Sequence, residues 1–404
     1  MRRVARVIAR LNVGGPAIQA TSLSSHLRAF GYGTLLIYGR LSPGEGDMGY
    51  LLTADHATEV VPTLGREMAP IRDLRAWWRI YRRLCRFRPH IVHTHTAKAG
   101  ALGRLAAVAY NRTAGRREPA RLVHTYHGHV FDGYFGGAST RFFLGVERWL
   151  ARYTDALVAI SPRVKTDLLE TYRIATASQA HVIPLGFDLS PFAAIDEAGR
   201  SRARAALGIP PGRRVVATVG RLTAIKQHAL FLEMAQLVTR NVPGVDYLVV
   251  GDGELRASLE ALVATLGLAG SVRFLGWRRD LTTIYGATDV FVLTSRNEGT
   301  PVALIEAMAS GVPGVSTDVG GVRDVIVSPE VGVVVPFGEP QALAAAVQDL
   351  LESPDRRRVI GDRARAAVLG RFHLDRLLSD VANLYNSLLP NTCAVMSGSV
   401  RDAR

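Results

Sequence analysis

Cysteine is scarce in this 404-residue sequence, which contains only Cys85 and Cys393. The two residues are too few and too far apart to form the framework of a disulfide-rich fold or the ligand set of a zinc site. Low cysteine content is typical of proteins that work in a reducing compartment. We therefore expect a cytoplasmic protein without structural disulfides.

Long apolar runs are missing too. No segment approaches the ~18 consecutive apolar residues that a membrane-spanning helix needs. The first residues, MRRVARVIARLNVGG, are basic but contain no uninterrupted apolar core and no cleavage site. We therefore expect neither a signal peptide nor a transmembrane segment.

Acidic residues are outnumbered by basic ones, at 35 against 49, which gives a formal net charge of +14. This excess suits nucleic acid, an anionic membrane surface or phosphorylated substrates as partners. The basic residues are spread along the chain without a motif that reads nucleic acid, so we expect no nucleic-acid partner.

The densest basic segment is IRDLRAWWRIYRRLCRFRP, residues 71–89. Its apolar residues, among them Trp77, Ile80 and Leu84, recur at helical spacing between arginines. One interpretation is a helix that packs on the core and exposes a basic face to solvent. The alternative is a surface helix that rests on anionic lipid at the inner face of a membrane.

Short β-rich runs alternate with helical stretches, which predicts an α/β fold with parallel sheets. The expected strands are residues 4–10, 34–39, 58–62, 91–95, 121–126, 155–160, 214–222, 246–254, 271–277, 289–295, 312–318 and 331–337. They predict two Rossmann-like domains that face each other across a cleft, toward which the carboxyl ends of the strands point.

We place the N-terminal domain at residues 1–189 and the C-terminal domain at 190–373. The polar stretch 190–214 interrupts the alternation, and we interpret it as an interdomain linker with a helical piece. The amphipathic segment 374–389 is expected to cross back onto the first domain, and 390–404 to form a flexible tail.

The most informative segment is SRNEGTPVALIEAMASG, residues 295–311. Thr300 can cap a helix that begins at Pro301 and is ended by Gly311. Because the segment follows an expected strand, the N–H groups at this helix start lie at the carboxyl edge of the sheet and can bind a diphosphate.

Glu298 and Glu306 flank this helix start, which suits a ligand with hydroxyl groups on both sides of its phosphates, such as a nucleotide sugar. The alternative is an ordinary capped helix with two surface glutamates. Arg221 and Lys226, in VGRLTAIKQH, follow the strand 214–222. Fixed cations there can stabilise negative charge on a departing diphosphate, although a solvated helix start gives the same pattern.

Six of the eleven histidines lie between residues 90 and 129. His93 and His95 alternate onto one strand face. A metal site is one interpretation, but no cysteine or carboxylate completes a ligand set, so we expect no metal there. His127 follows the strand 121–126 at the cleft edge, which favours contact with a substrate.

With these motifs in view, the sequence resembles glycosyltransferase family 4. The resemblance rests on the paired glutamates, on the whole block SRNEGTPVALIEAMASGVPGVSTDVGGVRDVI, on the GG after the first strand, and on IVHTH, HTYHGH and GRL…K. It covers nearly the entire chain. It implies the GT-B fold and a retaining transferase that uses a nucleotide-sugar donor.

The resemblance also implies roles for individual residues. The expected catalytic group is Arg221, Lys226, Glu298 and His127. Glu306 would hold the ribose hydroxyls, and the base would be read through the backbone around 276–278. The donor site would comprise Gly15, Gly276, Arg278, Gly299, Thr300, Pro301, Val302 and Glu306. The chain departs from the family at Gln227, where a glycine often follows the lysine.

The donor is expected to be a UDP-sugar, with GDP-mannose as an alternative. Acceptor-side candidates are Thr96 and Lys98, after the strand 91–95, and His129 in the glycine- and aromatic-rich loop 127–137. The basic, aromatic first domain fits a lipid-linked sugar in surface polysaccharide biosynthesis, and a soluble acceptor is the alternative. The sequence makes no prediction of the oligomeric state.

Asp-x-Asp triplets, which many other glycosyltransferases use to hold a divalent ion, are absent from the sequence. We therefore expect no metal and no other cofactor. The motifs also offer no general base or protein nucleophile opposite the leaving group, which favours front-face attack and retention. Two alternatives remain, namely a nucleotide-sugar epimerase or phosphorylase of the same plan, and a non-catalytic carbohydrate or nucleic-acid binder.

Overall fold

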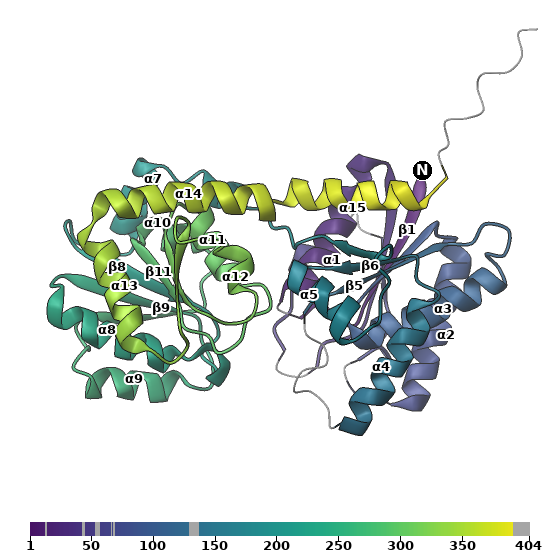
Figure 1. Ribbon diagram of the computed structural model, residues 1–404, viewed down its shortest axis with the longest axis horizontal. Coiled ribbons are helices and arrows are strands. Elements are labelled where there is room, and N and C mark those ends of the chain that lie inside the picture. The colour runs from purple at the N-terminus through teal and green to yellow at the C-terminus, as the bar shows by residue number, and fades with distance from the viewer. Residues whose placement is uncertain are drawn as a thin grey trace, which may run out of the picture. The chain divides into compact units, whose positions relative to one another are not determined.

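The computed structural model describes residues 1–12, 14–42, 45–52, 57–65, 67, 69–128 and 137–390, without the side chains of 137–140 (Figure 1). The chain divides into two compact units. Unit 1 comprises Met1–Gly186 together with Leu374–Arg404, and unit 2 comprises Phe187–His373. The predicted tail beyond 390, most of the loop 127–137 and His129 lie outside the described residues.

In its described part, unit 1 contains a seven-stranded sheet in the order β3-β2-β1-β4-β5-β6-β7, and every pair is parallel. Its strands are β1 (Arg2–Ile8), β2 (Tyr32–Tyr38), β3 (Thr58–Val60), β4 (Ile91–His95), β5 (Arg121–Tyr126), β6 (Ala156–Ala159) and β7 (Ala180–Val182). Its helices are α1 (Gly15–His26), α2 (Pro70–Phe87), α3 (Ala97–Arg112), α4 (Gly137–Ala151), α5 (Pro162–Thr166) and α15 (Leu374–Leu388). The strand order reverses between β1 and β4, where ligands bind in such sheets.

Unit 2, all of whose residues are described, contains a six-stranded parallel sheet in the order β10-β9-β8-β11-β12-β13. Its strands are β8 (Arg214–Val219), β9 (Val245–Val250), β10 (Val272–Gly276), β11 (Val290–Leu293), β12 (Gly314–Thr317) and β13 (Gly332–Val335). Its helices are α6 (Ser190–Ala193), α7 (Glu197–Ala206), α8 (His228–Asn241), α9 (Arg256–Thr265), α10 (Leu281–Ala287), α11 (Val302–Ala309), α12 (Val322–Val325), α13 (Pro340–Glu352) and α14 (Pro354–Phe372). Two α/β units with parallel sheets confirm the predicted fold class.

Helices cover both faces of the unit 1 sheet (Figure 1). Along β1, Ala5 and Val7 pack with α2 and α3, whereas Val4 packs with α1 and α15. This alternation follows from the two-residue period of a strand. The last helix, α15, buries Leu377 and Tyr385 in the unit 1 core.

The helical piece expected within residues 190–214 is present, but the interpretation of this stretch as a linker was wrong. Helix α7 packs on α10, and Ala203, Leu207 and Ile209 are buried against the unit 2 sheet. The boundary between the units falls earlier, between Gly186 and Phe187. Of the arginines of α7 that made this stretch look polar, Arg202 is exposed, whereas Arg200 and Arg204 contact Asp289 within unit 2.

Helix α2 confirms the core-packing interpretation of the basic segment, since Ala76, Ile80 and Leu84 are fully buried. The helix also presents Ile71, Leu74 and Trp78 to solvent, with 71%, 65% and 50% of their surface exposed. Among the described helices, none is both long and apolar enough to cross a membrane.

Candidate functional site

The carboxyl edge of the unit 2 sheet brings together segments that lie far apart in the sequence. Strands β8 and β11 are neighbours, so the residues that follow them meet at one edge. The ammonium of Lys226 lies 2.6 Å from Oε1 of Glu298, and Ser295 donates a hydrogen bond of 2.5 Å to the same oxygen. Both side chains are largely buried, with 24% of Lys226 and 9% of Glu298 exposed.

Lys226 lies in a 3-10 turn, Ala224–Lys226, and α8 begins two residues later at His228. Lys226 therefore lies before the helix and not within it. Gln227 interrupts the helix because it adopts a left-handed conformation, with φ of 51°. Glycine takes that conformation without strain, which gives a physical reason for the glycine often found at this position in the family.

The turn that carries Lys226 is anchored to the segment after β11. Thr294 donates a hydrogen bond of 3.1 Å to the carbonyl of Lys226, and the amide of Arg296 donates one of 2.8 Å to the carbonyl of Ile225. These bonds fix the lysine relative to Glu298. Arg221, by contrast, is exposed, and its guanidinium has no hydrogen-bond or ion-pair partner among the described residues.

Helix α11 begins one residue later than predicted. Val302 is its first helical residue and Pro301 is its N-cap, because Pro301 has a non-helical ψ of 81°. Thr300 therefore does not cap the helix. The end was predicted correctly, since Gly311 follows the helix with φ of 74°. The amides of the first turn lie at the carboxyl edge beside Glu298, where helix starts favour anions.

A pair of glycines, Gly320 and Gly321, supports the backbone at this edge. The amide of Gly321 donates a hydrogen bond of 2.9 Å to the carbonyl of Glu298. A Cβ atom on Gly320 would lie 2.0 Å from that carbonyl oxygen, and one on Gly321 would lie 1.9 Å from the carbonyl oxygen of Gly299. Only glycine allows the backbone to approach so closely, so the pair fixes the chain around Glu298.

Glu306 lies on α11 with a different partner from Glu298. The hydroxyl of Tyr285, a fully buried residue of α10, donates a hydrogen bond of 3.1 Å to Oε2 of Glu306. Burial raises the pKa of Glu306 to about 7, and the bond from Tyr285 opposes that rise. Near neutral pH the carboxyl is therefore divided between its neutral and ionised forms. No motif of the sequence pointed to Tyr285.

The segment after β10 was expected to read the base. Gly276 has φ of 63°, and its carbonyl accepts a hydrogen bond of 2.8 Å from the amide of Gly251. Arg278 makes a bidentate pair with Asp280, at 2.8 and 2.5 Å. Its guanidinium is thus held locally. The hydrogen bonds between the two side chains raise the pKa of Arg278 and lower the pKa of Asp280.

In unit 1, Gly15 is the first residue of α1, which follows β1 at the carboxyl edge. A Cβ atom at this position would lie 2.7 Å from Cδ1 of Leu185, so a larger residue would displace that side chain. Thr96 precedes α3 with φ of 65°, and its buried hydroxyl has no partner among the described residues. The side chain of Lys98 already has partners within unit 1, since its ammonium lies 2.6 Å from Asp73 and contacts the carbonyl of Glu67.

The histidines of unit 1 form a buried chain. His93 and His95 stack with ring centroids 4.4 Å apart, on one strand face as predicted. His95 Nδ1 lies 3.0 Å from His127 Nε2, and His93 bonds the hydroxyl of Tyr385 at 2.6 Å. Burial lowers the pKa of all three histidines, that of His127 to about 3, so they are neutral at neutral pH. His127 Nδ1 is buried without a partner among the described residues.

Within the described residues, no group of three or more histidine, cysteine, aspartate or glutamate side chains is arranged to hold a metal ion. The geometry thus places a lysine, a carboxylate and a helix start together in unit 2, and a chain of neutral imidazoles in unit 1.

Comparisons with known proteins place this arrangement in a class. The model of glycosyltransferase family 4 matches residues 13–191, and the model of glycosyl transferases group 1 matches residues 199–367. A glycosyltransferase of Rickettsia africae ESF-5 matches with a TM-score of 0.79 at 20% identity, over 97% of this chain and 99% of that one. Anabaena HepE, solved in complex with UDP, also gives 0.79, at 22% identity over 96% and 100%.

Two curated relatives match at higher identity. A UDP-Gal:alpha-D-GlcNAc-diphosphoundecaprenol alpha-1,3-galactosyltransferase of Escherichia coli is 29% identical over 82% of this chain and 84% of its own length. The lipopolysaccharide core biosynthesis mannosyltransferase LpcC of Rhizobium leguminosarum bv. viciae is 31% identical over 63% and 71%. The fold and the family models together define a glycosyltransferase with the two-unit GT-B fold. The chain belongs to glycosyltransferase family 4, as the sequence motifs predicted.

Proposed function

We propose that this glycosyltransferase moves a sugar, with retention of its anomeric configuration and without a divalent metal, from a UDP-sugar to a lipid-linked sugar. The observation that carries the donor part is the pair of Lys226 and Glu298 beside the start of α11. A phosphate bound by Lys226 would lie next to sugar hydroxyls bound by Glu298, because the two groups are 2.6 Å apart.

The diphosphate would be neutralised by three groups of unit 2. Lys226 supplies a fixed charge, the exposed guanidinium of Arg221 supplies a bidentate donor, and the first turn of α11 supplies free amides. Charge that develops on the departing phosphate is then stabilised by groups that need no reorganisation. These groups take the place that a divalent ion has in enzymes with Asp-x-Asp triplets.

The sugar and ribose would be held by carboxylates. Glu298 keeps acceptor capacity on its Oε2, since Lys226 and Ser295 both bond Oε1. Glu306 would accept bonds from the ribose hydroxyls in its ionised form. His127 Nδ1 would bond a hydroxyl of the transferred sugar, with the ring orientation set by His95.

Front-face transfer fits these side chains best. The acceptor oxygen bonds the anomeric carbon as the carbon–phosphate oxygen bond breaks on the same face, and the acceptor proton passes to the departing phosphate oxygen. Glu298 is engaged by Lys226 and Ser295, and Glu306 by Tyr285, so neither stands free as a nucleophile. Imidazoles with a lowered pKa, about 3 for His127, are weak bases for an acceptor hydroxyl.

The donor and acceptor classes are supported by the relatives. The name of the Escherichia coli relative gives a UDP-sugar donor and a diphosphoundecaprenol-linked acceptor, whereas LpcC is a mannosyltransferase. The test is incubation of the full chain with UDP- and GDP-sugars and undecaprenyl-diphosphate-linked GlcNAc, with products separated by mass. We expect a UDP-sugar to give transfer. Transfer from GDP-mannose alone contradicts the donor, and an epimerised donor without transfer contradicts the activity.

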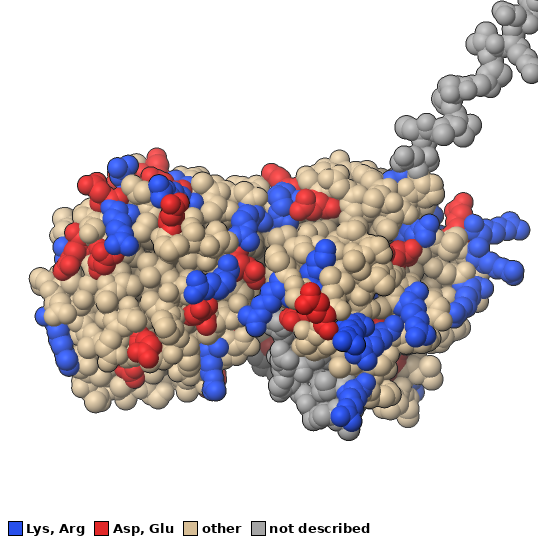
Figure 2. Space-filling view, viewed as in Figure 1, with Lys and Arg blue, Asp and Glu red and all other residues tan. Residues whose placement is uncertain are grey.

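Helix α2 supports contact with an anionic membrane. Its exposed apolar residues Ile71, Leu74 and Trp78 adjoin exposed arginines without partners among the described residues. These arginines, spaced along one stripe of the helix, are Arg75, Arg79, Arg82 and Arg86. Figure 2 shows blue side chains gathered over the part of unit 1 that carries α2 and α3. Apolar and basic stripes side by side are the pattern of helices that lie in the plane of a membrane surface.

Vesicle flotation tests this contact. The full chain should float with phosphatidylglycerol-containing vesicles and not with phosphatidylcholine alone. Trp78→Ala should reduce the bound fraction several-fold, whereas Trp277→Ala, at an exposed tryptophan of unit 2, should not. Equal binding to both kinds of vesicle contradicts the electrostatic part of the proposal.

A further inference from the structure

Unit 2 contains a second polar region, at the amino edge of its sheet. A cavity of about 710 Å³ lies there, between the residues that precede β8, β11 and β12 and the helices α7 and α14. Lys226, Glu298 and the start of α11 follow the strands at the opposite, carboxyl edge. The cavity is therefore separate from the proposed donor site.

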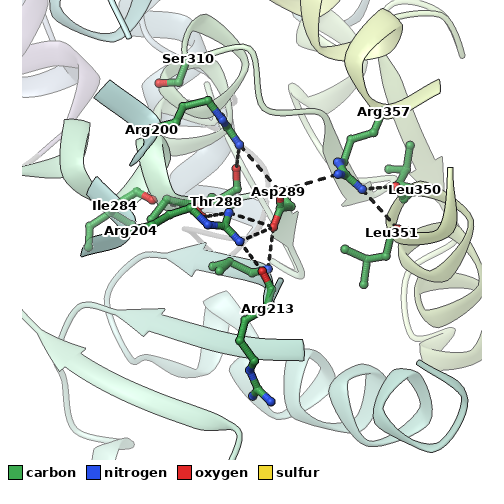
Figure 3. Close-up of polar contacts among 12 residues, drawn as sticks. Arg200, Arg204, Arg213, Ile284, Thr288, Asp289, Ser310, Leu350, Leu351 and Arg357 are labelled. Atoms are coloured by element: carbon green, nitrogen blue, oxygen red, sulfur yellow. Dashed lines mark hydrogen bonds and ion pairs between the residues drawn. The ribbon is translucent and has the colours of Figure 1, made fainter. Parts of the chain in front are cut away.

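One carboxylate organises the arginines of this cavity. Figure 3 shows Arg200, Arg204 and Arg357 pointing toward Asp289. The guanidinium nitrogens lie 3.8, 3.3 and 3.9 Å from its oxygens, respectively, and the amide of Val215 bonds the same carboxylate at 2.8 Å. A single negative charge thus faces three positive ones, of which only Arg204 lies within hydrogen-bond distance of it.

The cavity carries an excess of positive charge. Seven arginines and four acidic residues line it, and one of the arginines, Arg213, pairs with Asp246 outside the cavity, which leaves two uncompensated positive charges. One of the acids, Asp196, already caps α7 by accepting a bond of 2.7 Å from the amide of Gly199. Burial lowers the pKa of Arg200. The charges of Asp289 and Glu197 oppose this effect, and those of Arg204 and Arg357 add to it. Positive charge is therefore crowded here beyond what the local acids compensate.

Arg358 is the arginine most available to a ligand. It stands on α14 and lines the cavity, it is exposed, and it has no hydrogen-bond or ion-pair partner among the described residues. Arg365, on the same side of the helix, donates a bond of 3.0 Å to the carbonyl of Ser310, and its buried Nε has no partner. Two guanidinium groups thus keep donors that the protein does not use.

We propose that this cavity binds a small phosphorylated anion with two or more negative charges, of the class of diphosphates, sugar phosphates and nucleotides. Guanidinium groups match phosphate oxygens in bidentate geometry and keep their charge at all relevant pH values. The cavity volume of about 710 Å³ falls in the range of small-molecule sites, about 300–1,000 Å³. A site of this size admits a molecule larger than a single phosphate ion.

The probe is pyrophosphate, titrated calorimetrically into the full chain carrying Arg221→Ala and Lys226→Ala, which removes the donor-site cations. We expect one binding event that Arg358→Ala weakens about tenfold, equivalent to about 1.4 kcal/mol. The matched control is Arg363→Ala. Arg363 is an exposed arginine of α14 that does not line the cavity and pairs with Glu330. It should change the affinity by less than about twofold.

No pyrophosphate binding to the protein without donor-site cations overturns the proposal. Equal weakening by both arginine substitutions overturns it too, because that result reports only the general surface charge of α14. Thermal melting confirms that each variant is folded. Repeating the titration with UDP and with glucose 1-phosphate identifies the class of ligand, and a site that depends on Arg358 for either compound supports the proposal.

Discussion

The carboxyl edges of the two sheets are built from opposite chemistry. In unit 2 the edge carries charge, with Lys226 and Glu298 2.6 Å apart beside a helix start. In unit 1 the corresponding edge carries His93, His95 and His127, whose burial keeps them neutral. We infer that unit 2 handles the phosphate charge of the donor, while unit 1 contributes neutral hydrogen bonds to sugar hydroxyls.

The largest expected effect comes from the charged edge. Lys226→Ala should lower kcat about a hundredfold or more, because a fixed charge that stabilises the departing phosphate is lost. The matched control is Arg240→Ala, which removes an exposed cation from the end of α8 in the same unit. Steady-state kinetics on both variants measure the difference. A Lys226→Ala variant with the kcat of the wild type would contradict the role of charge at the carboxyl edge of unit 2.

A smaller effect is expected from loss of Glu306, the residue proposed to bind the ribose hydroxyls of the donor. Glu306→Ala should weaken UDP binding about tenfold, as loss of hydrogen bonds to a charged group costs about 1.5–3 kcal/mol. Calorimetry with UDP measures it, and Glu352→Ala, at an exposed position on α13, is the control. UDP affinity that does not change in the Glu306 variant contradicts the assignment.

The same carboxyl gives a pH dependence. Because the pKa of Glu306 is raised to about 7, the group is mostly protonated at pH 6 and mostly ionised at pH 8. Only the ionised form accepts two bonds from ribose hydroxyls, so UDP affinity should rise several-fold between these pH values. In Glu306→Gln the rise attributable to this group should vanish. An identical pH profile in the two proteins would refute the role of this titration.

Substitution of a histidine at the neutral edge of unit 1 should lower activity less than substitution of Lys226 at the charged edge of unit 2. His127→Ala should lower kcat/KM about tenfold, since one neutral hydrogen bond is lost and a buried partner, His95, is left exposed to water. His90→Ala, which removes a histidine outside the chain of stacked rings, controls for general destabilisation. A loss as large as that of Lys226→Ala would show that charge is not what separates the two edges.

The smallest expected effect is that of chelation. Activity should be unchanged in excess EDTA, because fixed cations and helix amides would neutralise the diphosphate. The measurement is the transfer rate with EDTA and with added magnesium or manganese. If EDTA abolished activity and either metal restored it, a metal ion and not the side chains of unit 2 would neutralise the diphosphate.

Buried parallel strands were predictable because their apolar runs are distinct. The strands expected at 91–95 and 121–126 coincide with β4 and β5. The first residues of the helices were less predictable than the strands. The left-handed Gln227 and the non-helical Pro301 each shift a helix start, and neither conformation follows from the residue type alone. The stretch 190–214 looked like a linker because it contains five arginines and its buried apolar residues, Ala203, Leu207 and Ile209, are few.

The contacts between side chains of the site were harder to predict than the identity of its residues. Glu306 and Lys226 stand in motifs, but Tyr285 reaches Glu306 from another helix, and no sequence spacing indicates that contact. The arginine-lined cavity could not be predicted for the same reason, since its residues come from α7, from the segments before three strands and from α14. Sequence patterns record neighbours along one element, whereas these contacts depend on how separate elements pack.

The stereochemistry of transfer tests the central claim most directly. If the charged groups of unit 2 stabilise the departing phosphate and unit 1 supplies no base, the acceptor must attack on the face of the leaving group. Proton NMR of the new linkage, recorded early in the reaction with an α-linked UDP-sugar, reads the anomeric coupling. We predict a small coupling for a gluco- or galacto-configured sugar, which marks an α-linkage. A β-linked product would contradict this division of chemistry between the two units.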